Sequence, residues 1–313
     1  MQKNKVLSTG EKPPTAKLGE GSTADAAIST GPEHFDTAFG RPRNFLNNRF
    51  AYTVISQRAR GLSIGVNLNP DKRCNFDCLY CEVNRDEPAR DHKVDIKVMA
   101  AELESLLIQA CENKLGELAW FRNLPTELLQ LKEVALSGDG EPTLCPNFAE
   151  IVREVVHLRS KGKFPFFKIV LITNTAGLDL PEVKAGLKSL APQDEIWVKL
   201  DAGTQKYMDT VNRADITLRK VTSNILRIGR QRPVVIQSLF PLIDGQGPSP
   251  EEIEQYVNRL KKLKAARAQI SMVQIYSAHR PPHRPYCGHL PLKSLSHIAR
   301  RVREVTGLRA EVF

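Results

Sequence analysis

Residues 62–313 alternate between short apolar runs and longer amphipathic segments. The apolar runs have the length of strands, whereas the amphipathic segments repeat their apolar residues at helical spacing. Strands are predicted at 62–68, 133–136, 167–172, 196–200, 234–239 and 270–276. Helices are predicted at 98–108, 148–158, 180–190, 217–228, 249–266 and 292–305, and the Ser-x-x-Glu pattern at 249–252 predicts a capping box at the start of the fifth. Strands and helices that alternate in this way predict a parallel sheet with right-handed crossovers.

The number of repeats limits the architecture. Six strand–helix units are fewer than the eight of a closed barrel, so we expect an α/β fold with a partial (β/α)6 barrel. Residues 308–313 are expected to add a last strand, and residues 113–130 an insertion or a short helix. Residues 41–61 are basic and are expected to pack as an irregular lead-in, which makes 41–313 one barrel domain. Residues 1–40 lack a hydrophobic period, and we interpret them as a flexible, disordered tail.

Charge and hydropathy narrow the possible partners and location. The net charge is +10, with basic residues concentrated at 41–60 and after Val257. Such a surface can neutralise RNA phosphates, or it can simply consist of solvated helix faces. No apolar run approaches the ~20 residues that span a bilayer, so no membrane partner is expected. Without an apolar signal core, and with acidic residues near the start, the chain is expected in the cytoplasm.

Three cysteines follow the first predicted strand at CxxxCxxC spacing: Cys74, Cys78 and Cys81. Thiolates are soft ligands for iron–sulfur clusters and for zinc. Ordinary sites of both kinds use four protein ligands, so a group of three suggests a cluster with one metal corner left for another ligand. Zinc remains an alternative, because a later group of residues can supply further ligands: His279, His283, Cys287 and His289. We interpret the dispersed Cys111, Cys145 and Cys287 as ordinary thiols.

Polar motifs follow the next three predicted strands. Gly138 and Gly140 allow a close approach of backbone to a ligand, and the carboxylates of Asp139 and Glu141 can accept bonds from a ligand ammonium group. Later strand ends supply Asn174, Lys199 and Asp201. Each of these motifs can also serve only as a turn or a cap. Because the carboxyl ends of parallel strands share one edge of a sheet, we expect the motifs to lie with the cysteines.

The cysteine motif has an aromatic residue, Tyr80, directly before its third cysteine, on the loop after the first strand of a partial barrel. In this setting the chain resembles the radical S-adenosylmethionine (SAM) superfamily. The resemblance implies a 4Fe–4S cluster held by the three motif cysteines, with S-adenosylmethionine chelated at the open iron. Reductive cleavage of that cofactor then gives a 5′-deoxyadenosyl radical. An electron donor of the flavodoxin or ferredoxin kind is implied as a partner.

The resemblance also implies roles for the strand-end residues. Gly138, Gly140 and Glu141 correspond to a GGE motif that meets the methionine amino group. Asp139 stands where a glycine is expected, so both acids are candidates and Glu141 is favoured. The implied contacts to the adenosine or the methionine carboxylate come from Tyr80, Asn174, Lys199 and Asp201.

Further segments resemble a branch of the superfamily related to wyosine synthesis, whose members modify a guanosine in tRNA. These segments are GDGEPTL, KLDAGT, 211–213 and 280–282. Residues 1–73 contain no cysteine, whereas the tRNA enzyme of that branch carries additional N-terminal cysteines. RNA base modification is the first expectation, with Arg213 and Arg280 binding a phosphate or carboxylate of the substrate. The alternatives are an activase-like enzyme that modifies a protein or peptide, and a zinc-bearing RNA-binding module.

Overall fold

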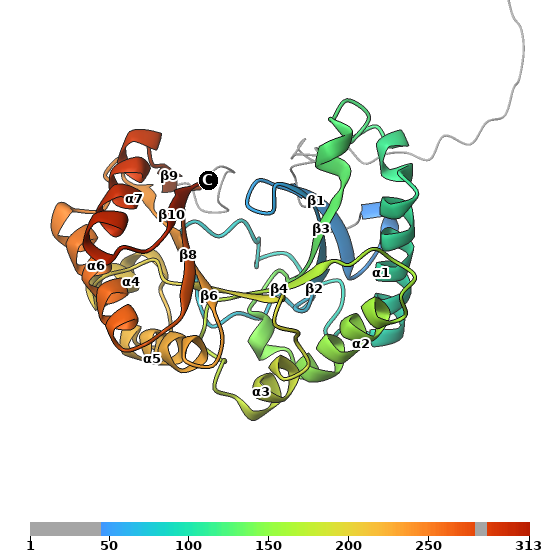
Figure 1. Cartoon of the computed structure of the whole chain (residues 1–313), viewed down its shortest axis with the longest axis horizontal. Helices are drawn as coiled ribbons and strands as arrows, with labels where there is room; N and C mark the ends of the chain where they lie inside the picture. Colours follow the sequence, from blue (N-terminus) through green and yellow to red (C-terminus); the bar gives the residue numbers. More distant parts are fainter. Residues whose placement is uncertain (1–44, 279–286) are drawn as a thin grey trace, which may run out of the picture. The chain divides into compact units, whose positions relative to one another are not determined.

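The six predicted strands form the middle of an eight-stranded sheet in the computed structural model, which describes residues 45–278 and 287–313 (Figure 1). Every neighbouring pair is parallel except the first, in which β1 runs antiparallel to β2. In spatial order the strands are β1 (Ala51–Ser56), β2 (Gly61–Asn67), β3 (Leu131–Ser137), β4 (Lys168–Thr173), β5 (Glu195–Lys199), β6 (Val234–Leu239), β8 (Ile270–Tyr276) and β10 (Ala310–Val312).

Helices cover the outer face of this curved sheet (Figure 1). They are α1 (Ile96–Cys111), α2 (Phe148–Ser160), α3 (Pro181–Leu187), α4 (Gln205–Val211), α5 (Leu218–Gly229), α6 (Pro250–Ala265) and α7 (Leu292–Thr306). Short 3-10 helices occur at η1 (Phe45–Asn47), η2 (Lys114–Glu117), η3 (Thr126–Leu129) and η4 (Pro142–Leu144). The partial (β/α)6 barrel expected from the sequence is therefore confirmed, with an extra strand at each edge of the sheet.

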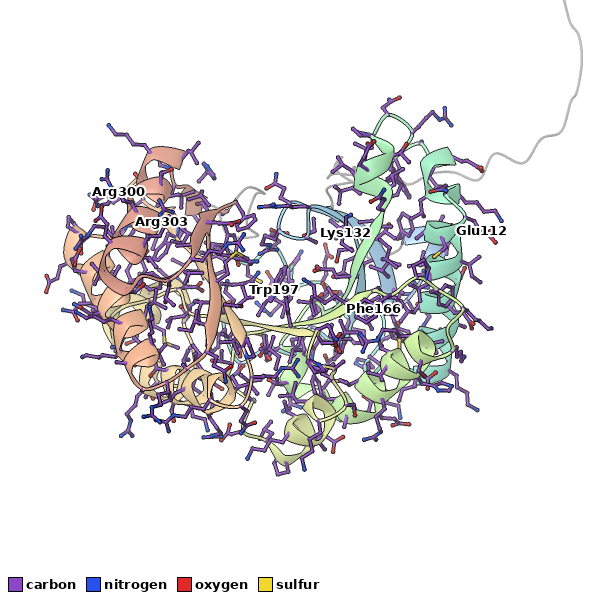
Figure 2. All side chains as sticks on the ribbon, viewed as in Figure 1. Glu112, Lys132, Phe166, Trp197, Arg300 and Arg303 are labelled. Carbon is purple, nitrogen blue, oxygen red and sulfur yellow. The ribbon has the colours of Figure 1, made fainter. Side chains whose placement is uncertain are left out.

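The main core lies between the sheet and the helices. Helices α2 and α7 each turn one apolar stripe toward the strands, as their helical spacing requires. A second, small apolar cluster of Val170, Trp197 and Val235 lies on the inner face of the sheet. Figure 2 shows Trp197 inside the curve of the sheet, whereas Glu112 and Arg300 lie on the outer side. The inner face thus combines apolar and polar side chains around a space that the helices do not fill.

Two elements differ from the expectation. We expected an irregular lead-in at 41–61, but β1 pairs with β2 along all six of its residues. Its six residues, AYTVIS, include the polar Thr53 and Ser56 and lie between Arg49 and Arg58, so this basic segment lacks the continuous apolar run by which the other strands were predicted. Helix α4 was also not expected. Thr204 begins it, and the Thr204 hydroxyl accepts a hydrogen bond from the backbone of Tyr207 at 3.1 Å.

The remaining regular structure is a two-stranded antiparallel pair of β7 (Pro241–Ile243) and β9 (Cys287–His289). The edges of the large sheet approach each other through Arg60, in the β1–β2 turn, and Glu311, on β10. Their side chains form an ion pair with a nitrogen–oxygen distance of 3.2 Å. The tail expected at 1–40 lies outside the described residues. Within those residues, no helix is long and apolar enough to cross a bilayer.

Candidate active site

The cysteine loop follows β2 and packs against the end of α4. Its backbone is fixed there by two hydrogen bonds, from Asp77 N to Asn212 O at 3.0 Å and from Leu79 N to Val211 O at 2.9 Å. Cys74, Cys78 and Cys81 are half-buried, and none of them forms a disulfide. The three thiols are thus held on a loop whose conformation is set by the neighbouring helix end.

Burial determines the protonation of Cys74 and Cys78. It raises the pKa of Cys74 to about 12 and that of Cys78 to about 11. At neutral pH they are therefore protonated unless a bound metal replaces the proton. Across residues 45–278 and 287–313, no group of three or more His, Cys, Asp and Glu side chains is arranged to hold a single metal ion. A multinuclear cluster does not need that arrangement, because each thiolate binds a different iron, and the all-thiol donor set suits iron–sulfur chemistry.

The glycines after β3 allow close packing within the protein. A side chain on Gly140 would place its Cβ 2.0 Å from the carbonyl oxygen of Arg73, in the cysteine loop. A side chain on Gly138 would come within 2.3 Å of Oδ1 of Asn67. The backbone nitrogen of Glu141 also donates to Arg73 O at 2.9 Å. We expected these glycines to admit a ligand. What the structure adds is that they bring the β3 end against the cysteine loop.

Glu141 lies buried beneath this contact, and its carboxylate accepts bonds from both neighbouring strand ends. The donors are the backbone nitrogen of Thr143 at 3.0 Å, the Thr143 hydroxyl at 2.6 Å, the Thr173 hydroxyl, and the backbone nitrogen of Asn174 at 2.7 Å. Burial raises the pKa of Glu141, while these hydrogen bonds oppose that rise. Glu141 therefore fixes the ends of β3 and β4 relative to each other. Its predicted contact with a ligand ammonium group stays a prediction.

The two polar neighbours of Glu141 are held by different partners. Asp139 accepts a hydrogen bond from Nδ2 of Asn67 at 2.8 Å, which ties it to the end of β2. Asn174 donates to Oδ1 of Asn75 at 2.8 Å, and its Nδ2 lies 3.9 Å from Sγ of Cys74. Both residues, predicted from strand-end motifs, thus lie beside the cysteine loop.

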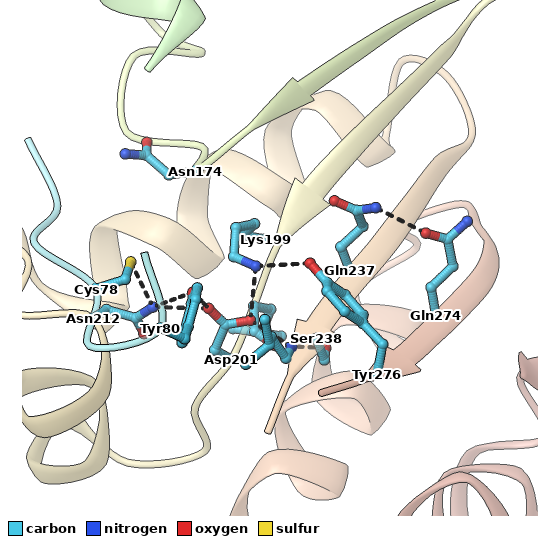
Figure 3. Close-up of polar contacts among 12 residues, drawn as sticks. Cys78, Tyr80, Asn174, Lys199, Asp201, Asn212, Gln237, Ser238, Gln274 and Tyr276 are labelled. Atoms are coloured by element: carbon cyan, nitrogen blue, oxygen red, sulfur yellow. Dashed lines mark hydrogen bonds and ion pairs between the residues drawn. The ribbon is translucent and has the colours of Figure 1, made fainter. Parts of the chain in front are cut away.

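A second polar network joins the cysteine loop to the end of β5 (Figure 3). Asp201 accepts hydrogen bonds from the Tyr80 hydroxyl, from Nδ2 of Asn212 at 2.8 Å, and from the backbone of Leu239 at 2.8 Å. Nζ of Lys199 lies 3.4 Å from Oδ1 of Asp201. Burial alone lowers the pKa of Lys199, but the Asp201 carboxylate raises it, and the net pKa is above its usual value.

Lys199 also faces two aromatic rings. Its Nζ lies 3.0 Å from the hydroxyl of Tyr276, and it stands over the rings of Tyr80 and Tyr276 at 5.0 and 5.2 Å from their centroids. Burial raises the pKa of Tyr80 well above its ordinary value, and the Asp201 charge adds to this effect. Tyr80 is therefore a neutral hydrogen-bond donor, and the Lys199–Asp201 pair is the charged centre of this side of the site.

Sequence reasoning selected Arg213 from the segment 211–213, but Asn212 is the residue that enters the site. Nδ2 of Asn212 lies 3.0 Å from the Tyr80 hydroxyl and 3.5 Å from Sγ of Cys78. Arg213 is exposed, and its guanidinium lies 3.7 Å from the carboxylate of Asp77. The sequence contained the adjacent Asn212 and Arg213 after the fourth predicted strand, and this pair alone does not reveal which of the two side chains points inward. Arg280 lies outside the described residues.

One cavity of about 490 Å³ connects these groups. Its lining includes the three motif cysteines together with Gly138, Asp139, Gly140, Glu141, Asn174, Lys199 and Tyr80. A partial barrel with thiols and polar strand-end groups around one cavity defines a class of cofactor-binding barrel enzymes, with the site at the carboxyl ends of the strands.

The comparison with protein families identifies the class more closely. The model of the radical SAM superfamily matches residues 68–260, and the chain belongs to that superfamily. Membership implies an enzyme that uses S-adenosylmethionine and an iron–sulfur cluster. Asn212, Lys199 and the cysteine loop all fall within the matched range.

Related proteins include members of a group called UPF0026. The chain is 27% identical over 240 residues to such a protein of Helicobacter pylori, covering 75% of this chain and 70% of the relative. It is 26% identical over 180 residues to one of Methanocaldococcus jannaschii, covering 56% of this chain and 48% of the relative. The similarity to these relatives therefore extends well beyond the cysteine motif.

Solved structures show the same fold. TYW1 with a lysine-pyruvate adduct bound superposes with a TM-score of 0.52 at 15% identity, covering 79% of this chain and 74% of that chain. A mutant of spore photoproduct lyase superposes with a TM-score of 0.50 at 9% identity, covering 79% of this chain and 75% of that chain. At these identities the likeness establishes the fold alone.

Proposed function

We propose that Cys74, Cys78 and Cys81 hold a 4Fe–4S cluster and that S-adenosylmethionine binds at the iron without a protein thiolate. One observation carries this proposal. The three free thiols line the same cavity as the groups that the sequence analysis selected at the following strand ends, among them Glu141, Asn174 and Lys199. Thiolates in a group of three, beside a polar cavity, are suited to a cluster that leaves one metal corner for another ligand.

The bound cluster and cofactor would supply a 5′-deoxyadenosyl radical for hydrogen abstraction. The residues of the chain position the groups involved. Glu141 holds the ends of β3 and β4 together, so that the backbone there keeps a fixed approach to the cavity. Lys199 offers a positive charge for a carboxylate at the cavity lining, and the Asp201 carboxylate, which is not part of that lining, holds Lys199 in place. Asn212 and Tyr80 keep the Cys78 side of the loop in contact with Asp201.

For the substrate, we propose a base in RNA, and tRNA modification is the first candidate. The net charge of +10 and the basic segments support a polyanionic partner. The interior position of the cavity is consistent with a base that has left its stack. A flavodoxin- or ferredoxin-like protein is the proposed electron donor. The lining of the cavity includes Arg85, which lies 3.9 Å from Asp77 and is partly exposed, so it can contribute to binding an acidic surface.

The experiment begins with anaerobic reconstitution of the full chain. Iron content, visible absorption and reductant-dependent release of 5′-deoxyadenosine are measured for the wild type and for Cys78→Ala. The wild type is expected to take about four iron atoms and to release 5′-deoxyadenosine. Cys78→Ala should lose both properties. Cys145→Ala is the matched control, because Cys145 is buried outside the loop. A protein that takes zinc and never cleaves the cofactor would disprove the proposal.

The RNA substrate has its own test. Nucleosides from strains with and without the gene are compared by mass spectrometry, and the proposal expects one modified nucleoside to disappear with the gene. Restoration of the gene should return it, whereas the Cys78→Ala form should not. Identical nucleoside profiles in both strains would contradict RNA base modification and leave the cluster proposal standing.

A further inference from the structure

The cavity continues well beyond the groups assigned above. Its lining runs from the cysteine loop to Ser63 and Glu133, near the start of β2 and β3. Glu133 lies four residues before Ser137 on β3, which places it ~13 Å farther from the carboxyl ends of the strands. None of the proposed cluster or cofactor contacts uses this inner end of the cavity. A ligand there would lie inside the curve of the sheet.

Glu133 is unusual because it is buried with half of its carboxylate unpaired. Glu133 is only 1% exposed, and its Oε1 accepts a hydrogen bond from the Ser63 hydroxyl at 3.2 Å. Oε2 has no hydrogen-bond partner in the structure. Leaving a buried acceptor unpaired costs free energy, which a ligand with an N–H donor would recover. Burial also raises the pKa of Glu133, and the opposing charge of Lys168 is the largest influence that lowers it.

Arg58 supplies donors between Glu133 and Tyr276, the last residue of β8. It comes from the β1–β2 turn and reaches across to the opposite strands, where its guanidinium lies 4.8 Å from the ring centroid of Tyr276 and 5.8 Å from that of Trp197. Among residues 45–278 and 287–313, Arg58 forms no ion pair with a carboxylate within 4.0 Å. Its charge nevertheless lowers the pKa of Glu133. Its planar donors and the aromatic rings both line the cavity.

We propose that Glu133 and Arg58 form a substrate subsite for a planar nitrogen heterocycle that presents an N–H next to a carbonyl group. The free carboxylate oxygen accepts from the ring N–H, and the guanidinium donates to the adjacent carbonyl oxygen. Trp197 and Tyr276 supply flat apolar surface for the ring. Uracil and guanine present such an edge, whereas cytosine and adenine present an unprotonated ring nitrogen beside an amine. This subsite rests on the proposed function, since it defines which bases the same cavity takes.

The first test measures binding of uridine, guanosine, cytidine and adenosine to the full chain by saturation-transfer NMR, without reductant and at about pH 8, where the Glu133 carboxyl, with a pKa of about 7, is ionised. Uridine, guanosine or both are expected to bind at least about tenfold more tightly than cytidine and adenosine. Equal binding of all four nucleosides, or binding of none, would overturn the proposal. A preference for cytidine or adenosine would overturn the proposal as well, because these bases present a ring-nitrogen acceptor beside an amine donor instead of an N–H beside a carbonyl group.

Variants connect that preference to the two residues. Glu133→Leu removes the acceptor and Arg58→Leu removes the donors, and each should weaken binding of the preferred nucleoside about tenfold or more. Glu254→Gln is the matched control. Glu254 lies on α6 and pairs with Arg301 on α7 at 2.8 Å, and it is not among the residues that line the cavity. This variant should leave binding unchanged. Unchanged binding in both leucine variants would refute the assignment, and Arg58→Leu keeps the test valid if Glu133→Leu fails to fold.

This outcome can be separated from that of the cluster proposal. Iron content and release of 5′-deoxyadenosine report on the cysteine loop, and neither requires the inner end of the cavity. A chain that binds the nucleosides selectively but never cleaves S-adenosylmethionine would refute the radical function alone. A chain that cleaves the cofactor but shows no nucleoside selectivity would refute the subsite alone.

Discussion

Asn212 Nδ2 lies 2.8 Å from Oδ2 of Asp201, and this contact joins the end of α4 to the end of β5. The same nitrogen also reaches the Tyr80 hydroxyl and the sulfur of Cys78. One amide group therefore holds together the helix end, a strand end and the cysteine loop. The conformation of the cysteine loop therefore depends on Asn212, which lies outside that loop.

Replacing Asn212 with aspartate should loosen the cysteine loop. The substitution puts a second carboxylate next to Asp201 in a buried site, and like charges there repel. We expect Asn212→Asp to retain less iron per chain after reconstitution than Asn212→Ala, which removes the donor without adding charge. Iron and sulfide analysis of both purified variants measures the effect. Equal iron content in the wild type and Asn212→Asp would show that the contact does not support the site.

Replacing Gly140 with alanine should displace the loop from the other side. The new Cβ would come within 2.0 Å of a backbone oxygen, and backbone cannot yield as the end of a side chain can. We expect Gly140→Ala to destabilise the fold by about 1–3 kcal/mol and to lower cluster content. Urea unfolding and iron analysis measure the two effects. Gly116→Ala is the control, since its nearest contact is a side-chain atom at 3.4 Å, and it should behave much like the wild type.

The sequence predicted the order of the strands and helices because short apolar runs mark the strands and apolar residues at helical spacing mark the helices. It also placed Asn174 and Asp201 correctly at the strand ends around the cysteine loop. It did not predict β1, whose apolar run is interrupted by Thr53, or the contact of Arg58 with rings on β5 and β8. Contacts across the barrel join residues far apart in sequence, and local patterns contain no information about which of them meet.

Glu252 gives a further example. The Ser-x-x-Glu pattern at 249–252 predicted a capping box, and the Ser249 hydroxyl does accept from Glu252 N at 3.1 Å. The Glu252 carboxylate, however, binds another loop instead of returning to Ser249. It accepts from the backbone of Gly203, from the backbone of Thr204 at 3.2 Å, and from the Thr204 hydroxyl at 2.6 Å. Half of the predicted box is therefore wrong, because the tertiary contact offers more donors than the helix end.

Removing the Glu252 carboxylate should accordingly destabilise the loop after β5. We expect Glu252→Ala to lower the free energy of unfolding by about 2–3 kcal/mol, because buried backbone donors lose a charged acceptor. Denaturant unfolding of the cluster-free chain measures this change. Glu251→Ala, at the exposed neighbouring position in the first turn of α6, should cost about 0.5 kcal/mol or less. Similar losses in the two variants would contradict the assigned role.

The pH dependence of stability should reveal Glu133. Burial raises its pKa from 4.5 to about 7, while Lys168 and Arg58 lower it and Glu195 raises it. The unfolded chain releases this proton near pH 4.5, but the folded chain retains it up to about pH 7. Stability from this group is therefore lost as pH rises through that window, by roughly 3 kcal/mol at most, and stays constant above it.

The comparison for Glu133 is with Glu133→Gln, which cannot titrate. We expect the stability of the variant, relative to the wild type, to increase as pH rises from 4.5 to about 7 and then to level off. Urea unfolding across that range, with Glu195→Gln as a second reference, provides the measurement. Parallel pH profiles for the wild type and Glu133→Gln would mean that the carboxylate is solvated or paired in solution.

The ion pair between Arg60 and Glu311 has a mechanical consequence for this barrel. The β1–β2 turn and β10 meet there only through these two side chains among the ion pairs described, and the Arg60 side chain is 72% exposed. An ion pair this exposed contributes about 0–1 kcal/mol to the free energy of unfolding. Every other step around the sheet is a ladder of backbone hydrogen bonds. The seam between β1 and β10 can thus widen or narrow without breaking any ladder. Ionic strength acts directly on that seam, and so does a polyanion that competes for Arg60.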